Sequence, residues 1–325
     1  MNRHPSGAGE QPIPYSHFGS YLRERYEVRV HKVTIDAGFT CPNRDGTKGV
    51  GGCIYCNNEG FSAHSRPSRA GLSVARQVET GIEWARRRYK ARKFIAYFQA
   101  YTNTYAPLLT LKGLYDQVLD FPDVIGLDIG TRPDCVSPEI IDLVAGYTET
   151  LDEVWMEYGL QSSHDRTLQR INRGHDYQCF LDAVDATMGR GIKICVHVIL
   201  GLPGESREDM LVTADRLASV PIDGIKIHLL HLLRDTPIVS LHERGELELL
   251  GRGEYVSLVC DYLERLPKHV LVHRLTGEAP PETLIAPRWC LDKGGVLRDI
   301  KTEMRRRGVG QGSKLEVCHG ASLTS

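Results

Sequence analysis

Three of the chain's nine cysteines lie close together, in the segment CPNRDGTKGVGGCIYC at residues 41–56. Two residues separate Cys53 from Cys56, and eleven separate Cys41 from this pair. Thiolate sulfur is a soft ligand that suits zinc and iron–sulfur clusters. Glycines at positions 46, 49, 51 and 52 let the chain between the cysteines fold back tightly. The segment therefore predicts a metal site.

A structural zinc site and an iron–sulfur cluster differ in the number of protein ligands that they need. A structural zinc ion takes four ligands, and His64 is the only close candidate for the fourth. A cluster of four irons usually takes four cysteines, so that three cysteines leave one iron open. An open coordination position is reactive, as it is in catalytic zinc sites. The segment by itself leaves both a structural zinc site and a reactive cluster as alternatives.

The elements that would position these cysteines form a regular alternation. Short β-prone segments are separated by segments of helical period, and they occur at 28–35, 93–99, 124–130, 153–160, 192–200 and 225–233. One helical face runs through 71–90, and Ser206 with Asp209 is a capping box at the start of another helix. Such alternation predicts an α/β fold with a parallel sheet, either an open doubly wound sheet or a βα barrel. Both place ligands at the carboxyl ends of the strands, where the cysteine segment lies.

The two ends of the chain differ from this regular part. Residues 1–24 are expected to be an N-terminal tail. Its first twenty residues are rich in Pro, Gly and Ser, and we expect residues 1–20 to be mobile or loosely docked. The core is expected at 25–235. Residues 236–325 are expected to be a C-terminal cap with two helices and a short strand, at 254–266, 291–307 and 269–273.

Composition narrows the classes of function. Of 325 residues, Lys and Arg number 40 and Asp and Glu 41, so the net charge is −1 and any contact with nucleic acid must come from a local patch. No run approaches 18 apolar residues, and the first residues lack the apolar core of a secretory signal. We therefore expect a cytoplasmic protein whose cysteines stay reduced.

Further motifs follow the cysteine segment, at or after the ends of the third, fourth and fifth expected strands. They are GTRPDC at 130–135, MEYGLQS at 156–162, INRGHD at 171–176 and ILGLPGE at 199–205. Together with Tyr55 before the last cysteine, they resemble the radical S-adenosylmethionine (radical SAM) superfamily. The resemblance is to a bacterial family close to the Elongator catalytic subunit and coproporphyrinogen-oxidase branches. It implies a partial (βα)6 radical SAM barrel with a small C-terminal α+β cap. The long gap after Cys41 departs from the common C-x3-C-x2-C spacing.

The resemblance also implies the cofactors. Cys41, Cys53 and Cys56 would hold a [4Fe-4S] cluster, and its open iron would chelate the amino and carboxylate groups of S-adenosyl-L-methionine. An electron donor such as flavodoxin or ferredoxin would reduce the cluster. Reductive cleavage would then produce a 5′-deoxyadenosyl radical that abstracts hydrogen from the substrate.

Residues that would contact S-adenosylmethionine are assigned where this sequence matches the family. Tyr55, Gly201 and Leu202 would contact the adenine, Glu157 and Gln161 the ribose, and Arg173 the methionine carboxylate. The methionine amino group would meet the turn after the second strand, through Gln99, Tyr101 and Asn103. This turn lacks the family's glycines and acid, and Glu205 comes one residue later than the family's pattern has it. No residue is assigned a catalytic role.

The substrate is predicted from weaker signals. Basic clusters at 86–93 and 305–307 are usually solvated helix ends, but they would bind phosphates if they lay on one face. Resemblance to the Elongator catalytic subunit favours tRNA as the partner and wobble-uridine modification as the function. The alternatives are an enzyme acting on a small molecule such as a tetrapyrrole, and a non-catalytic zinc-stabilised binding protein.

Two further pairs of residues complete the candidates. Cys135 and Cys195 would donate hydrogen if they faced a barrel lumen, although a buried cysteine is more often a small apolar residue. His228 and His231 lie three apart in an expected strand, so at most one of them should face the lumen.

Overall fold

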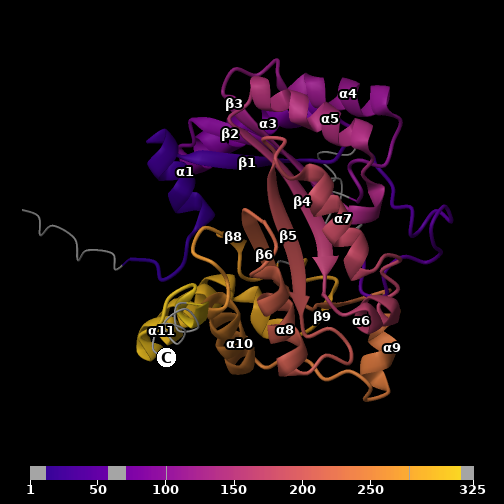
Figure 1. Ribbon diagram of the computed structural model, residues 1–325, viewed down its shortest axis with the longest axis vertical. Coiled ribbons are helices and arrows are strands. Elements are labelled where there is room, and N and C mark those ends of the chain that lie inside the picture. The colour runs from indigo at the N-terminus through magenta and orange to yellow at the C-terminus, as the bar shows by residue number, and fades with distance from the viewer. Residues whose placement is uncertain (1–11, 58–70, 100, 278, 316–325) are drawn as a thin grey trace, which may run out of the picture.

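The computed structural model describes residues 12–57, 71–99, 101–277 and 279–315. Its centre is a parallel sheet of seven strands in chain order, curved into an open half-barrel (Figure 1). The strands are β1 (Val30–Ile35), β2 (Lys93–Phe98), β3 (Val124–Thr131), β4 (Glu153–Gln161), β5 (Lys193–Leu200), β6 (Gly224–Leu229) and β8 (Leu271–Arg274). The predicted α/β partial barrel is confirmed, and each of the six expected strands is present.

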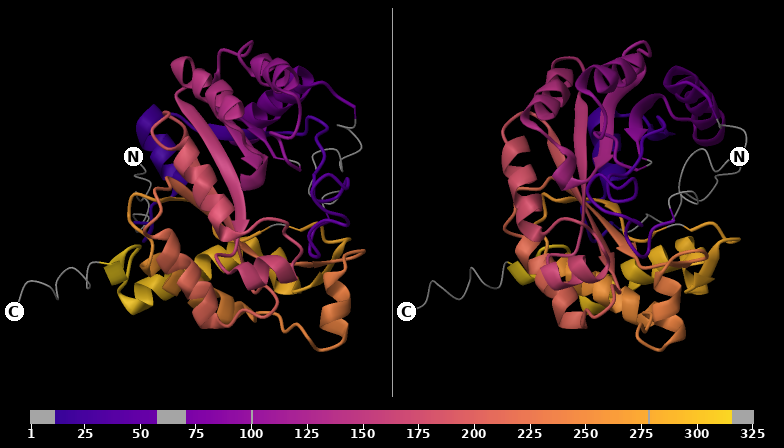
Figure 2. Two further views of the ribbon diagram at one scale, coloured as in Figure 1. Left: turned by 45° about the vertical axis from the view of Figure 1, so that its right-hand side comes forward. Right: turned by 90° about the vertical axis from the view of Figure 1, so that its right-hand side faces the viewer.

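Helices connect successive strands along the outer face of the sheet (Figure 2). They are α3 (Val74–Tyr89), α4 (Leu108–Tyr115), α5 (Pro138–Gly146), α6 (Asp165–Arg170), α7 (Tyr177–Thr187) and α8 (Arg207–Leu217), with short 3-10 turns at Asp116–Val118, Pro133–Cys135 and Tyr147–Glu149. The predicted capping box is confirmed, since Asp209 N donates to Ser206 Oγ at 3.2 Å and Ser206 N donates to Asp209 Oδ2 at 2.9 Å. Val78, Ile82 and Ala85 of α3 are buried, as the helical period predicts.

Two strands in the middle of the sheet are almost wholly buried. All residues of β3 are buried, and Gln161 alone in β4 is half-buried. Helices cover one face of these strands, and the other face lines the barrel lumen. Parallel strands that are covered on both faces are rich in apolar residues. A charged side chain within such a strand must therefore find its partners inside the lumen.

The C-terminal part completes the sheet as well as covering it. The short strand expected in the cap is β8, which pairs with β6 and becomes the seventh strand. The strand expected at 225–233 ends at Leu229, and β7 (Leu232–Leu233) then pairs with β9 (Leu284–Ala286) in a separate two-stranded sheet. The remaining helices are α9 (Ile238–Glu243), α10 (Arg252–Glu264), α11 (Lys293–Arg307) and the 3-10 turn Arg288–Leu291. No helix among the described residues is both long and apolar enough to cross a membrane.

The N-terminal segment is docked, so the expectation of a loose tail is wrong for residues 14–20. Helix α1 (Phe18–Tyr26) buries Phe18 and Leu22. The Phe18 ring stacks on His273 of β8 with a centroid distance of 3.8 Å and meets Trp155 of β4 edge-on at 5.4 Å. Aromatic stacking of this kind, with the apolar area it buries, outweighs the entropy of an ordered tail. Helix α1 thereby packs at the amino end of the lumen.

Backbone contacts join this N-terminal segment to the C-terminal part. Val272 N donates to Ser16 O at 2.7 Å, which extends the sheet beyond β8. Ser16 N donates to Gln311 Oε1 at 2.9 Å, and Gln311 N donates to Pro14 O at 3.0 Å. Residues near the two ends of the described chain are therefore direct neighbours.

Candidate functional site

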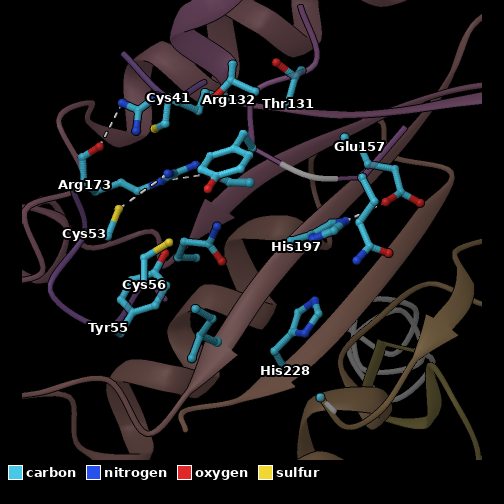
Figure 3. A pocket seen from close by; sticks show the side chains of 18 of the residues that line it. Cys41, Cys53, Tyr55, Cys56, Thr131, Arg132, Glu157, Arg173, His197 and His228 are labelled. Carbon is cyan, nitrogen blue, oxygen red and sulfur yellow. Dashed lines mark hydrogen bonds and ion pairs between the residues drawn. The ribbon is translucent and has the colours of Figure 1, made fainter. Parts of the chain in front are cut away.

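A cavity of about 270 Å³ lies at the carboxyl ends of the strands, where the sequence predicts the site. Figure 3 shows Cys41, Cys53 and Cys56 along one side and Glu157, His197 and His228 along the other. The cysteines come from the loop after β1, and the opposite group comes from β4, β5 and β6. Two chemically different walls thus face each other across one space.

The cysteine loop folds back on itself through a series of tight turns. Cys56 N donates to Cys53 O at 2.9 Å, and Gly52 N donates to Asn43 O at 2.8 Å. Gly52 has φ +76°, which a residue with a side chain rarely adopts. A Cβ at Gly49 would stand 2.2 Å from Asn43 Oδ1, so this position has no room for a side chain. The predicted role of the glycines is confirmed at these two positions.

The INRGHD motif holds this loop in place. Asn43 Nδ2 donates to Asn172 O at 2.6 Å, across 129 residues of sequence. Asn172 Nδ2 donates in return to Gly52 O at 2.7 Å, and Ile54 N donates to Ile171 O at 3.0 Å. These reciprocal hydrogen bonds make the two segments one frame around the sulfur atoms.

Arg173 of the same motif is a buried cation beside the cysteines. Its Nε and Nη2 atoms donate to Gly159 O at 3.2 and 2.5 Å, and its Nη1 atom lies 3.7 Å from Cys53 Sγ. A Cβ at Gly159 would meet Nη2 at 2.7 Å, so the glycine makes room for the guanidinium. Arg132 Nη2 donates to Arg173 O at 2.8 Å, and its pairing with Asp134 fixes it in turn. Arg173 is therefore held rigidly before any ligand binds.

Strand β4 places alternate residues on the cavity side. Glu157, Gly159 and Gln161 are two apart and all line the cavity, as the period of a strand requires. Gln161 has φ +80°, a left-handed conformation that costs a non-glycine residue about 1–3 kcal/mol. Strain of this kind is concentrated at functional sites, and here it ends the strand with the side chain at the cavity.

The residues predicted to bind the cofactors divide into two groups. Those that line the cavity are Cys41, Cys53, Cys56, Tyr55, Gln99, Tyr101, Glu157, Gln161 and Arg173. Asn103, Gly201 and Leu202 do not line it. The Asn103 side chain donates to Gly130 O at 2.7 Å, and Leu202 packs with Tyr55 in an apolar cluster beneath the loop. The role assigned to each residue stays a prediction.

A charged network that the sequence reading missed fills the lumen below the cavity. Lys226 Nζ lies 2.5 Å and Lys32 Nζ 3.1 Å from the Glu157 carboxylate, and His197 Nε2 lies 2.8 Å from it. Lys32 also pairs with Asp128. The available signal was a charged residue in the middle of an apolar strand, as in VHKVTI, GLDIG and IKIHL.

Electrostatics fix the charge states in this network. Burial favours a neutral Glu157, but Lys226 and Lys32 outweigh burial and hold its pKa well below the usual value. Burial, reinforced by Glu157, raises the pKa of Asp128 to about 7. Burial lowers the pKa of His197 to about 4. Glu157 is thus an ionised carboxylate, and both of its oxygens already have hydrogen-bond partners in Lys32, His197 and Lys226.

The prediction for His228 and His231 is wrong, because both line the cavity. Strand β6 ends at Leu229, one residue after His228. The alternation of faces therefore stops before His231, and the chain turns its side chain back to the same space. Cys195 lies in the lumen but does not line the cavity, and Cys135 also lies outside it.

The two basic clusters lie apart and are partly neutralised. The first is at the C-terminal end of α3, which leads into the amino end of β2, away from the cysteines. Figure 1 shows α3 and α11 near opposite ends of the long axis. Arg86 pairs with Asp123, and Arg306 and Arg307 both pair with Glu303. The single phosphate-binding face that was considered is not formed.

The three cysteines suit a cluster better than a single ion. Glu157, Cys195 and His197 are the group of described residues whose ligand atoms gather within 4.8 Å, and the three loop cysteines are not such a group. Zinc–sulfur bonds of about 2.3 Å would draw the sulfurs closer together than this. Burial and Cys53 raise the pKa of Cys56 to about 12, so a bound cation would be needed to keep the Cys56 sulfur as a thiolate.

Two other possible metal ligations carry less weight. His64, the candidate fourth zinc ligand, lies outside the described residues. At the group around Glu157, the ammonium groups of Lys226 and Lys32 already occupy the carboxylate, which disfavours a divalent cation there. All described cysteines are free thiols, as expected for a reduced protein, and Cys318 lies outside the described residues.

Comparison with known families and proteins agrees with this geometry. The family model of the radical SAM superfamily matches residues 41–217, and that of the Radical_SAM C-terminal domain matches residues 222–306. Protein YtqA of Bacillus subtilis is 42% identical over 308 residues, which cover 93% of this chain and 95% of YtqA.

Two more distant proteins share part of the sequence or the fold. The tRNA uridine(34) acetyltransferase of Methanocaldococcus infernus is 25% identical over 165 residues, 50% of this chain and 30% of that protein. Elp3 of the same organism, with its N-terminus deleted, superimposes with a TM-score of 0.68 at 17% identity. The superposition covers 87% of this chain and 64% of Elp3, and it shows a common fold.

Proposed function

The chain belongs to the radical SAM superfamily, and from this premise we propose that it modifies a wobble uridine of tRNA. It is a radical SAM enzyme whose cofactors are a [4Fe-4S] cluster and S-adenosyl-L-methionine. Family membership decides against the non-catalytic zinc protein. The cysteine loop supplies the three thiolates that leave one iron open.

The cofactors supply one-electron chemistry that abstracts hydrogen from an unactivated carbon. The protein supplies position and exclusion of water. We assign Cys41, Cys53 and Cys56 to the cluster, with Arg173 fixed beside Cys53 to pair with the methionine carboxylate. We assign Tyr55 to the adenine and Gln161 to the ribose, since both residues line the cavity. A cavity built from rigid strand ends holds reacting atoms in a productive geometry.

One observation carries the choice of tRNA, namely the similarity over half the chain to tRNA uridine(34) acetyltransferases. The fold shared with Elp3 agrees with it. The basic cluster at 86–93 lies away from the cavity, so it would contact only a part of the tRNA remote from the reacting base. Flavodoxin or ferredoxin stays our proposal for the electron donor.

Nucleoside mass spectrometry of tRNA from a strain in which the gene is deleted tests this function. We expect one wobble nucleoside to fall and its precursor to accumulate. The parent gene should restore the pattern, and a Cys53→Ala variant, which loses a cluster ligand, should not. Unchanged nucleosides would refute the tRNA assignment and leave an enzyme for small molecules such as tetrapyrroles.

A further inference from the structure

The lining of the cavity is strongly cationic. Four arginines among the described residues line it, and Glu157 is the one acidic residue there. Glu157 is already neutralised by Lys226 and Lys32. Arg132 pairs with Asp134, but the other arginines still leave the lining with more positive than negative charge, and such an excess favours an anionic ligand. The arginines are Arg44, Arg132, Arg173 and Arg274.

Three of these arginines are accounted for by their surroundings. Arg173 binds Gly159 O and faces Cys53, and Arg132 pairs with Asp134. Arg44 belongs to the cysteine loop and acts on the pKa of Cys56, so it lies beside the metal site. The fourth arginine, Arg274, comes from the opposite edge of the sheet, at the end of β8.

Arg274 has no partner in the part of the chain that the structure describes. It is half-buried, and it makes neither a hydrogen bond nor an ion pair with any of these residues. A guanidinium carries five N–H donors in a planar fork that matches two oxygen atoms of one anion. Placing a charge in a partly buried position costs free energy unless the charge is paired, so an anion bound in the cavity would stabilise this guanidinium.

Two histidines of the cavity lining have unused ring nitrogens, His228 close to Arg274 and His231 close to His228. The Nε2 atoms of His228 and His231 are buried and have no hydrogen-bond partner among the described residues. Burial lowers the pKa of His231 to about 4 and that of His228 well below its usual value, so both rings are neutral and each has one N–H to donate. Arg274 adds to the shift at His228, which places the guanidinium close to that ring.

A glycine makes room for this arrangement. A Cβ at Gly277 would stand 2.7 Å from His231 Cε1. Gly277 lines the cavity together with His231, so the ring packs on the glycine backbone at the cavity edge. A larger residue here would push the imidazole out of its place.

We propose that Arg274, His228 and His231 form a subsite that binds an oxyanion of the substrate, phosphate or carboxylate, on the wall opposite the cysteines. Figure 3 shows His228 across the cavity from Cys53 and Cys56. An anion held there would fix the substrate while its reacting carbon faces the cofactors. The subsite itself does not depend on the proposed function. Only the identity of the molecule that carries the anion rests on that function, because a tRNA substrate would supply a phosphate from each nucleotide.

Isothermal titration calorimetry of the full chain with inorganic phosphate and, separately, with acetate tests the subsite. The parent should bind at least one of these anions saturably. Arg274→Ala should weaken that binding about tenfold or more, because a charge-assisted hydrogen bond is lost. His231→Ala should weaken it severalfold, and Arg274→Lys should retain part of it. Arg298→Ala is the matched control, since this exposed arginine of α11 does not line the cavity, and its affinity should equal that of the parent.

The calorimetric results distinguish a phosphate subsite, a carboxylate subsite and the absence of a subsite. Phosphate binding that depends on Arg274 assigns the anion to a phosphate group, and acetate binding that depends on Arg274 assigns it to a carboxylate. If neither anion binds, or if Arg274→Ala and Arg298→Ala bind alike while both melt as the parent does, the subsite is refuted. None of these results depends on tRNA, so the nucleoside experiment can fail while the subsite stands, and the reverse also holds.

Discussion

At the scale of single residues, Gly159 shows how one missing side chain arranges the site. Its backbone oxygen accepts two hydrogen bonds from Arg173, and the position that a Cβ would occupy is filled by the same guanidinium. The motif MEYGLQS could be recognised in the sequence, but the reason for its glycine could not. That reason is a contact with an arginine 14 residues away that only the fold brings near.

Gly159→Ala should destabilise the protein. The added Cβ would lie 2.7 Å from Arg173 Nη2 and 2.8 Å from Gln161 Nε2, so both side chains must shift. Overpacking of this kind costs about 1–3 kcal/mol in the free energy of unfolding, which urea titration measures. Gly113→Ala is the control, because a Cβ in that position of α4 meets nothing within 4 Å. Equal stability of the Gly159→Ala variant and the parent would contradict the close packing.

The lumen charges and His231 mark the limit of prediction for single residues. The alternation of Glu157 and Gln161 predicts that both face the cavity, and they do. The role of Lys226 could not be predicted, because the sequence does not show that its partner Glu157 lies in β4, two strands away from β6 in the sheet. The expectation that at most one of His228 and His231 faces the lumen is wrong, because the period of a strand cannot show where the strand ends.

At the scale of elements, helix α1 is an example of tertiary contact overriding composition. Pro, Gly and Ser suggested a tail, yet the hydroxyls of Tyr21 and Tyr26 donate to Glu153 at 2.9 and 3.0 Å. Glu153 is fully buried in β4, and Lys193 of β5 also binds it, at 2.8 Å. Alternating strands and helices could be predicted because their period is local, whereas the docking of α1 depends on partners more than 100 residues away in the sequence.

Glu153→Gln should make the stability less dependent on pH. Burial acts to raise the pKa of Glu153, but Lys193 and hydrogen bonds from Trp155 and Tyr21 outweigh it and hold the pKa below 4.5. A depressed pKa stabilises the fold above the unfolded value, and this stabilisation is lost as pH falls through the folded value. The variant should therefore be less stable by about 1–3 kcal/mol at pH 7, and the difference should shrink below about pH 4.5.

Urea unfolding at pH 7 and across the acid range measures this difference. Glu24→Gln is the matched control, because this residue is on the exposed side of α1, and it should follow the parent at every pH. A difference between Glu153→Gln and the parent that stays constant down to pH 3 would show that the ionised carboxylate does not anchor α1.

At the scale of the whole molecule, the cysteine loop is a junction between distant parts of the chain. Ile54 N donates to Ile171 O, and Ile238 N donates to Ile54 O. The loop therefore touches both the barrel and the C-terminal part. A ligand that binds only the folded state stabilises it, and metal binding to such a junction acts on the whole fold.

Loss of iron should consequently lower the melting temperature. Anaerobically reconstituted protein should melt several degrees above the same protein treated with a chelator, as followed by circular dichroism together with iron and sulfide analysis. The variant in which Cys41, Cys53 and Cys56 are all alanine should contain no iron and should melt at the same temperature with or without reconstitution. A parent protein that holds zinc and no iron would contradict the cluster assignment.

The pairing of Ser16 with Val272 and Gln311 also has a consequence for biogenesis. A nascent chain leaves the ribosome from its N-terminus, so Phe18 and Leu22 emerge long before their neighbours on β8. Contacts of such long sequence separation form late. The amino end of the barrel, where α1 packs, thus closes only after β8 has been synthesised.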